Sequence, residues 1–155
     1  MLFEKALIAH CSPTLASLKI ANLFSYPFET DAELEGHVSY WNSQMEKAGI
    51  CLTVLRKRNQ RALIYVCRSS EMEKELKNVQ VAKFLSAYGY KQMELADALE
   101  HLKERLSEDS EFPHEMGIFL GYPLEDVVGF IYHNGKNFQI SGPWKVYGDL
   151  SLIHI

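Results

Sequence analysis

The stretch ICLTVLRKRNQRALIYVCR, residues 50–68, decides how the fold is organised. It holds two apolar runs around a polar segment, and its β-branched residues Val54, Ile64 and Val66 favour extended backbone. We therefore predict two strands that pair around a polar turn. The run ALIYVC is apolar at every position, which predicts an inner strand that is covered on both faces.

A helical pattern precedes this hairpin. Thr30 and Glu33 have the spacing of a capping box at a helix start. Apolar residues then recur at helical intervals, and Gly49 suits a left-handed helix end. We therefore predict a helix between Thr30 and Gly49, which is the clearest helix of the chain.

Further helical patterns follow the hairpin. We predict a short charged helix that begins at Ser69 or Ser70, and a second helix that ends near Gly89. A third helix is predicted from Lys91 to about Glu108. Its apolar stripe comprises Leu95, Ala98, Leu99, Leu102 and Leu106.

The segment CSPTLASLKIANLF, residues 11–24, also predicts a helix. Ser12 can cap its first turn, and Pro13 suits the first helical position because its missing N–H would have no partner there. This prediction places Cys11 directly before a helix N-terminus, where the positive end of the helix dipole favours a thiolate.

The segment FPHEMGIFLGYPLEDVVGF, residues 112–130, combines a His-Glu pair with glycines and adjacent acids. We predict a strand for EMGIFLGY and a helix for PLEDVVGFIYHNG that starts at Pro123. Glu125 and Asp126 fill the first turn of that helix, which is a common dipole-matching arrangement and argues against a phosphate site. FQI and WKVYG predict short closing strands.

The order of these elements predicts an α+β fold, because helices and strands occur in runs rather than in strict alternation. We expect a single domain over residues 1–149 of the 155. It contains a small mixed β-sheet with a central hairpin, packed by about five helices.

The composition is that of a globular protein, and it limits the classes of partner that the protein is expected to bind. A formal net charge of −4 argues against nucleic acid, because phosphate binding needs a basic surface. The densest basic run, Arg56-Lys57-Arg58, is interpreted as charges that keep a hairpin turn in water. Without a membrane-length apolar run or a signal-peptide pattern, the chain is expected to be cytoplasmic and not to bind a membrane.

The spacing of the cysteines and the absence of known cofactor motifs predict that the protein binds neither a metal nor a cofactor. Cys11, Cys51 and Cys67 are expected to stay reduced in the cytoplasm. Their odd number and wide spacing form neither a disulfide framework nor a CxxC zinc motif. The chain also lacks a Walker lysine and a GxGxxG motif.

Four segments together resemble a known family: HCSPTLASLKIANLF around Cys11, LIYVCR around Cys67, FPHEMGIFLGYPLEDVVGF, and WKVYGD from Trp144. The chain is similar, from Leu2 to Asp149, to a family of small proteins from clostridia and other anaerobic gut bacteria that is known only as domain of unknown function 3793. The resemblance implies no activity that could be transferred to this chain.

The chain departs from the family at its C-terminal end. Family members often have a cysteine-containing turn before the Trp-Lys-Val-Tyr motif, where this chain has QISGPW, so a metal site there is not implied. Members also continue into a further helical segment, whereas this chain ends in LSLIHI. One reading frame of the mosaic-end adapter used in transposon-based sequencing libraries translates to these six residues. We therefore expect residues 150–155 to be a sequencing artefact and the C-terminal part of the family domain to be missing.

The catalytic hypothesis is a reactive thiol. A cysteine at a helix start that faces a histidine at a strand start can form a nucleophile and base, so Cys11 and His114 are the candidates. Glu115, Glu125 or Asp126 could orient the imidazole, and Glu115 is the candidate next to His114. The alternative is that Cys11 is a small buried residue and that His114 bonds a backbone carbonyl.

The ligand-binding hypothesis rests on His10, Tyr122, Trp144 and Tyr147. The aromatic residues Trp144, Tyr147 and Tyr122, together with Phe112, could line a pocket for a flat or apolar ligand, although aromatic residues in closing strands also commonly form core. A metal site from His10, Cys11, His114 and Glu115 is disfavoured, because adjacent residues on a strand point to opposite faces.

The sequence does not decide the function. The leading interpretation is an uncharacterised cytoplasmic bacterial protein that serves as a small binding or accessory protein. The first alternative is a thiol-dependent hydrolase or transferase with Cys11 as nucleophile and His114 as base. The second is a structural or protein-interaction domain whose partner is another protein or the missing C-terminal segment.

Overall fold

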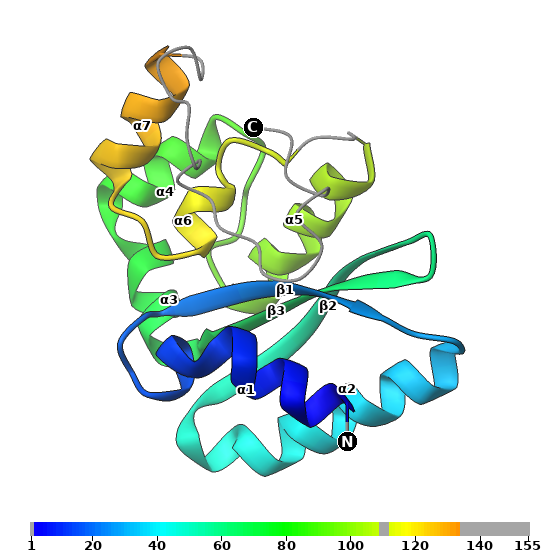
Figure 1. The fold of residues 1–155 in the computed structure, drawn as a ribbon. Coiled ribbons are helices and arrows are strands. Elements are labelled where there is room, and N and C mark those ends of the chain that lie inside the picture. Colours follow the sequence, from blue (N-terminus) through cyan, green and yellow to red (C-terminus); the bar gives the residue numbers. More distant parts are fainter. Residues whose placement is uncertain (1, 109–111, 134–155) are drawn as a thin grey trace.

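A three-stranded antiparallel sheet lies at the centre of the computed structural model, which describes residues 2–108 and 112–133 (Figure 1). The strands are β1 (Ala21–Pro27), β2 (Ile50–Arg58) and β3 (Arg61–Arg68), in the spatial order β1-β3-β2. β3 is therefore the inner strand, and residues 62–67 of it are all buried. This confirms the predicted hairpin and its doubly covered second strand.

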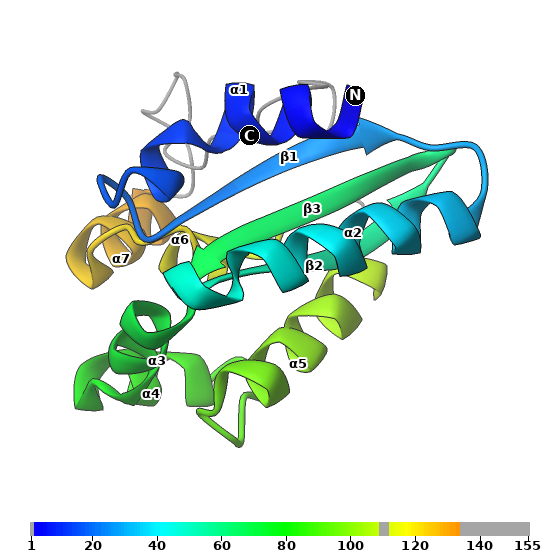
Figure 2. The ribbon, with the colours of Figure 1, turned by 90° about the horizontal axis from the view of Figure 1, so that it is seen from below.

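Helices cover both faces of the sheet. Figures 1 and 2 show α1 and α2 on one face, and the helices that follow the hairpin on the other. The first group, named the α1–α2 layer, comprises α1 (Leu2–Leu15) and α2 (Asp31–Met45), which a short 3-10 helix (Glu46–Ala48) follows. The second, named the α3–α7 layer, comprises α3 (Ser69–Lys77), α4 (Val79–Ser86), α5 (Leu95–Glu108), α6 (Met116–Phe119) and α7 (Leu124–His133).

Each layer has its own apolar core, and β3 contributes to both. Ile64 and Val66 pack with the α1–α2 layer, whereas Leu63 and Tyr65 pack with the α3–α7 layer. Successive side chains of a strand point to opposite faces, so one apolar strand can serve two cores. The predicted α+β fold is therefore confirmed.

Local sequence signals correctly located α2 and α5. The Glu33 N–H donates to Thr30 Oγ1 over 3.1 Å, and Gly49 adopts a left-handed φ of +75° beyond the helix end. The predicted apolar stripe of α5 is buried. It faces the core because residues three and four positions apart share one side of a helix.

The helix predicted over residues 11–24 is wrong. α1 already begins at Leu2 and ends at Leu15, and the later part of the segment forms β1. The side chain of Arg68 donates from Nε to the Thr14 carbonyl over 3.0 Å and from Nη2 to the Leu15 carbonyl over 3.2 Å. These bonds satisfy carbonyls that have no partner at a helix end, so α1 stops there and the chain can pair with β3.

The strand predicted for residues 115–122 is also wrong, because α6 and a turn occupy this segment. The short apolar run fits a buried strand and a buried helical turn equally well. Gly121, with a φ of +88°, ends the turn. The predicted closing strands, Trp144, Tyr147 and the proposed artefact at residues 150–155 lie outside the described residues.

Candidate functional site

Cys11 lies inside α1 rather than before a helix start, and its side chain is fully buried in the α1–α2 layer. Burial raises the pKa of its thiol from the ordinary 9.0 to about 12, and the positive charge of Lys19 opposes this shift. The Cys11 thiol is therefore protonated at neutral pH. This matches the alternative in which Cys11 is a small buried residue.

The structure does not bring Cys11 and His114 together. His114 is exposed and lies two residues before Met116, which belongs to the core of the α3–α7 layer. Cys11 belongs to the core on the opposite face of the sheet. A nucleophile and its base need hydrogen-bond contact, which this arrangement does not provide.

Glu115 is buried and fully engaged by other residues. Its carboxylate accepts hydrogen bonds from Arg105 Nε at 2.6 Å, Arg105 Nη2 at 2.9 Å and the Tyr90 hydroxyl at 3.0 Å. The Arg105 guanidinium in turn stacks over the Tyr88 ring, 5.1 Å from its centre. This network ties the segment before α6 to α5. It gives Glu115 a structural partner and no contact with Cys11.

The predicted ligand residues are also separated. His10 stacks on Phe24, with ring centres 5.7 Å apart, in the α1–α2 layer. Tyr122 packs against the core of the α3–α7 layer, and the Lys19 ammonium lies 5.8 Å from its ring centre. His10 and Tyr122 therefore do not line one pocket.

A β-bulge in β2 turns Arg56 into the α3–α7 layer. Ile50, Leu52 and Val54 pack with the α1–α2 layer, so regular alternation would send Arg56 to that face as well. The pairing of β2 with β3 instead shifts between Val54 and Arg56, and Leu55 is the extra residue. A bulge of this kind redirects the side chains that follow it. Arg56 consequently lies on the face that α5 covers.

The Arg56 guanidinium is a buried cation without a described counter-ion. Only 9% of the residue is exposed, and its Cζ lies 5.6 Å from the ring centre of Phe112. Within residues 2–108 and 112–133, its Nη1 has no hydrogen-bond partner. Burial and the positive charge of Arg58 both lower the pKa of Arg56. Since an uncompensated buried charge is strongly unfavourable, this position favours an anion.

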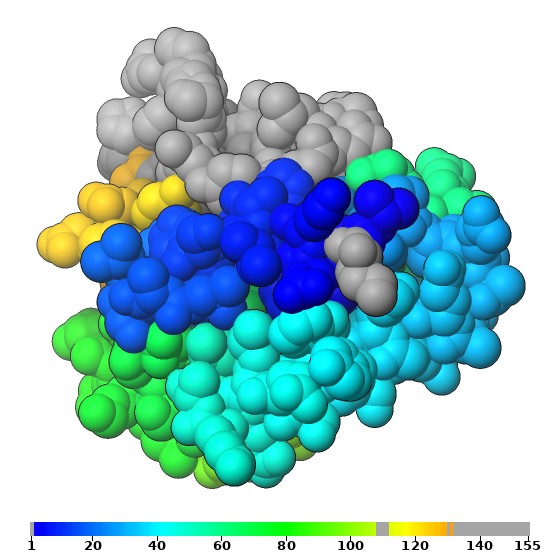
Figure 3. Space-filling view, turned by 60° about the horizontal axis from the view of Figure 1, so that its bottom comes forward, coloured from blue at the N-terminus to red at the C-terminus, as the bar shows by residue number. Residues whose placement is uncertain are grey.

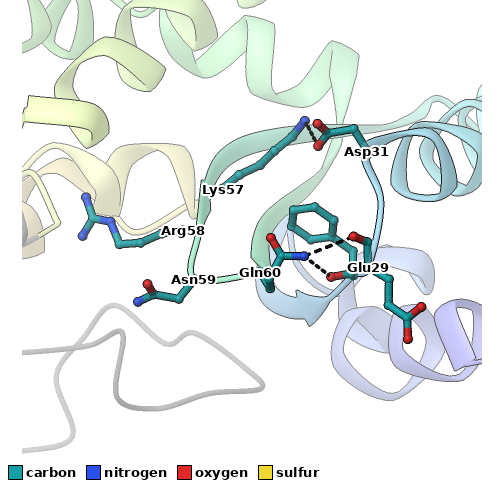
Figure 4. A pocket seen from close by; sticks show the side chains of 7 residues that line it. Glu29, Asp31, Lys57, Arg58, Asn59 and Gln60 are labelled. Carbon is teal, nitrogen blue, oxygen red and sulfur yellow. Dashed lines mark hydrogen bonds and ion pairs between the residues drawn. The ribbon is translucent and has the colours of Figure 1, made fainter.

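Figure 4 shows that Lys57 and Arg58, two consecutive basic residues of β2, point in different directions. Lys57 reaches the start of α2, where its Nζ lies 2.9 Å from Asp31 Oδ1, whereas Arg58 projects away from Asp31. The two residues line a polar pocket of about 300 Å³ beside the hairpin turn. Gln60 Nε2 closes one side by donating to the Phe28 carbonyl over 3.1 Å. Because Lys57 is paired on the α2 side, Arg56 and Arg58 provide the positive charge on the other side.

Figure 3 shows α1 beside α2 on the outer surface of the α1–α2 layer. A second hollow lies between these two helices. It has a volume of about 270 Å³ and is lined by Phe3, Glu4, His37, Tyr40 and Trp41. The His37 ring stacks on the Phe3 ring with centres 5.0 Å apart, and Tyr40 is exposed. These aromatic contacts hold α1 against α2.

The sequence interpretation of Arg56 as a solvated turn residue is wrong, because the side chain is buried. One signal was available in ICLTVLRKR. Ile50, Leu52 and Val54 alternate with less apolar residues, and Leu55 then breaks this period of two. An apolar residue out of phase before an arginine is compatible with a bulge, but alternation alone does not locate one.

The described residues combine a three-stranded antiparallel sheet with two helical layers, which define a small α+β protein. Among them is a buried arginine, Arg56, whose Nη1 has no hydrogen-bond partner in the described residues. The chain belongs to the family described as "Protein of unknown function (DUF3793)", whose model matches residues 7–152. Comparisons with curated proteins and with solved structures found no match. The family membership confirms the resemblance seen in the sequence and adds no activity to it.

Within the part of the chain that the structure describes, no helix combines the length and apolar composition needed to cross a bilayer. The same residues bring together no group of three or more His, Cys, Asp or Glu side chains that could hold a metal ion.

Proposed function

We propose that the protein is a small cytoplasmic bacterial binding protein and that Arg56 holds the anionic group of its ligand. The observation that carries this proposal is the buried guanidinium of Arg56 with an unpaired Nη1. The ligand carries a carboxylate or a phosphate, because a planar guanidinium binds either group through two parallel hydrogen bonds. The Arg56 guanidinium lies over the Phe112 ring, which supports it through a cation–π contact.

Two further features support an anion. Arg58 follows two residues after Arg56 in the regular part of the ladder, so it lies on the same face and adds a second positive charge. Lys57 between them is held by Asp31 on the opposite face, so that acid does not neutralise Arg56.

The competing explanation for the buried charge of Arg56 is that an acidic residue of the chain itself pairs with it. Asp109 and Glu111 precede Phe112 in the sequence and lie outside the described residues.

Thermal unfolding at constant ionic strength tests the proposal, with inorganic phosphate and citrate as the two probes and potassium chloride as the reference salt. We expect a probe to raise the Tm of the wild-type chain in a concentration-dependent way. At a hundred times its Kd, a ligand adds about 2.7 kcal/mol to the free energy of unfolding. Arg56→Gln should abolish this increase. Lys57→Gln is the matched control and should retain it, because Lys57 lies on the other face.

The same variants show whether Arg56 pairs with a bound ligand or with an acidic side chain of the chain itself. Without a probe, Arg56→Gln should leave stability unchanged or increase it, because it removes an uncompensated buried charge. If Asp109 or Glu111 paired with Arg56, Arg56→Gln would instead lower stability by about 3 kcal/mol. Asp109→Asn or Glu111→Gln would then have a similar effect, and the wild-type Tm would not respond to either probe. That combination would overturn the proposal.

A further inference from the structure

Cys51 and Cys67 face each other across the β2–β3 ladder on the α3–α7 face of the sheet. Their Sγ atoms lie 3.4 Å apart. Cys67 is fully buried, whereas Cys51 is partly exposed and can be reached from solvent. Cys51 is therefore the accessible thiol of the pair, and Cys67 is the buried one.

The bulge at Leu55 creates this pairing. Next to the turn, Arg58 pairs with Arg61. Cys51 lies seven residues before Arg58, and a regular ladder would pair it with Arg68, which lies seven residues after Arg61. The extra residue shifts the register by one, so Cys51 lies opposite Cys67. The wide spacing of the two cysteines in the sequence conceals this contact.

The two thiols differ in acidity. The hydrogen bond between the two thiols lowers the pKa of Cys51 to about 6, and a hydrogen bond with Ser69 acts in the same direction against burial and the charge of Glu73. The pKa of Cys67 is raised, first because its proton is shared with Cys51 and then because it is buried. Ser69 is the first residue of α3, and a helix N-terminus also favours a thiolate. Cys51 is therefore the nucleophile of the pair.

The ladder geometry makes a bond between these cysteines reversible. The Ser69 N–H donates to the Gly49 carbonyl over 2.9 Å, two positions beyond the cysteines on each strand. Because hydrogen-bonded pairs recur at every second position, Cys51 and Cys67 also form a hydrogen-bonded pair. The Cβ atoms of such pairs stand further apart than a relaxed disulfide prefers. A disulfide at this position is strained and is easily reduced again.

We propose that Cys51 and Cys67 form a reversible thiol–disulfide exchange site that reacts with small disulfides such as oxidised glutathione. In the first step, the Cys51 thiolate attacks one sulfur of the disulfide, forms a mixed disulfide and releases one glutathione thiolate. In the second step, Cys67 loses its proton and attacks Cys51 Sγ, which releases the second glutathione. The protein loses two electrons and two protons, and one oxidised glutathione becomes two reduced molecules.

Incubation of the purified chain with oxidised glutathione tests this site. Intact-mass spectrometry should show the loss of two hydrogen atoms, and peptide mapping should find Cys51 linked to Cys67. Excess reduced glutathione should restore both thiols. At pH 7, iodoacetamide should modify Cys51 at least about tenfold faster than Cys11 in the same molecule.

Substitutions of the two cysteines distinguish the role of Cys51 as nucleophile from the role of Cys67, which completes the disulfide. Cys67→Ser should accumulate one glutathione on Cys51, because the second step is blocked, and Cys51→Ser should remain unmodified. Cys11→Ala is the matched control and should form the disulfide as the wild type does. The proposal is overturned if the wild-type chain stays fully reduced, or if it keeps a bound glutathione without forming the internal bond. The wild-type peptide map and alkylation rates decide the matter even where a variant folds poorly.

Discussion

Tyr65 donates its phenolic hydroxyl to the backbone carbonyl of Phe119, which joins the inner strand of the sheet to α6. The two residues are 54 positions apart, and both are fully buried. Together with the packing of Ile118 and Phe119 in the same core as Tyr65, this bond holds the segment that precedes α7 against the sheet. It also gives a buried hydroxyl an acceptor for its proton.

We predict that Tyr65→Phe lowers the free energy of unfolding by about 1–3 kcal/mol, because the Phe119 carbonyl loses a buried donor. Urea denaturation measures the change. Tyr40→Phe is the control, since Tyr40 is exposed and its loss of a hydroxyl should have little effect. Equal stability of the two variants would contradict a structural role for the Tyr65 bond.

Glu115→Gln should destabilise the protein by about 2–4 kcal/mol, because it leaves the Arg105 guanidinium without its charged partner. The comparison is Glu100→Gln, which removes the exposed ion pair with Lys103 and should change stability by less than about 0.5 kcal/mol. Chemical denaturation at neutral pH gives both values. A small effect of Glu115→Gln would mean that the buried network contributes little to the fold.

Stability should fall above about pH 9, in part because of Cys11. Burial raises the pKa of this thiol from 9.0 to about 12. Between these values the unfolded chain has lost the thiol proton and the folded chain still holds it, so rising pH favours unfolding. This one group contributes a slope of about −1.4 kcal/mol per pH unit.

Denaturation curves from about pH 8 to about pH 10 test the Cys11 contribution, because the tyrosines and other thiols that ionise in this range are common to the wild type and Cys11→Ala. The wild-type free energy of unfolding should fall more steeply with pH than that of Cys11→Ala. The difference in slope isolates Cys11 even if the variant is less stable at every pH. Parallel curves for the two proteins would show that Cys11 does not titrate in this way.

Gly121→Ala should destabilise the protein by about 1–2 kcal/mol. Gly121 has a φ of +88°, and an added Cβ would lie 3.3 Å from the Cβ of Ile20. Gly36→Ala is a control with the opposite expected sign. Gly36 lies inside α2 with open space around it, so alanine should stabilise the helix by about 0.5–1 kcal/mol. Thermal unfolding of the two variants therefore gives shifts in opposite directions if both backbone environments are as described.

Elements with strong local signals could be predicted from the sequence. The capping residues Thr30 and Glu33 located the start of α2, and the apolar stripe between Leu95 and Leu106 identified α5. These signals depend on atoms a few residues apart, so they do not require knowledge of the rest of the fold. The family resemblance was equally accessible, because it depends on sequence motifs.

The candidate sites were not accessible in the same way. Pro13 fits the first turn of one helix or the last turn of another, and the choice of the wrong one placed Cys11 at a helix start. The deciding contact is made by Arg68, which caps the end of α1 from the far end of β3. A contact between residues so distant in sequence leaves no local pattern.

The sequence by itself determined the hairpin, the helices with clear caps and stripes, and the presence of two apolar faces on β3. Only the tertiary structure decided where the residues of the two proposed sites lie. The bulge at Leu55 turns Arg56 into the α3–α7 layer and, by the same one-residue shift, places Cys51 opposite Cys67. The physical reason is the period of two along a strand, because a single extra residue reverses every side chain beyond it and changes every partner across the ladder.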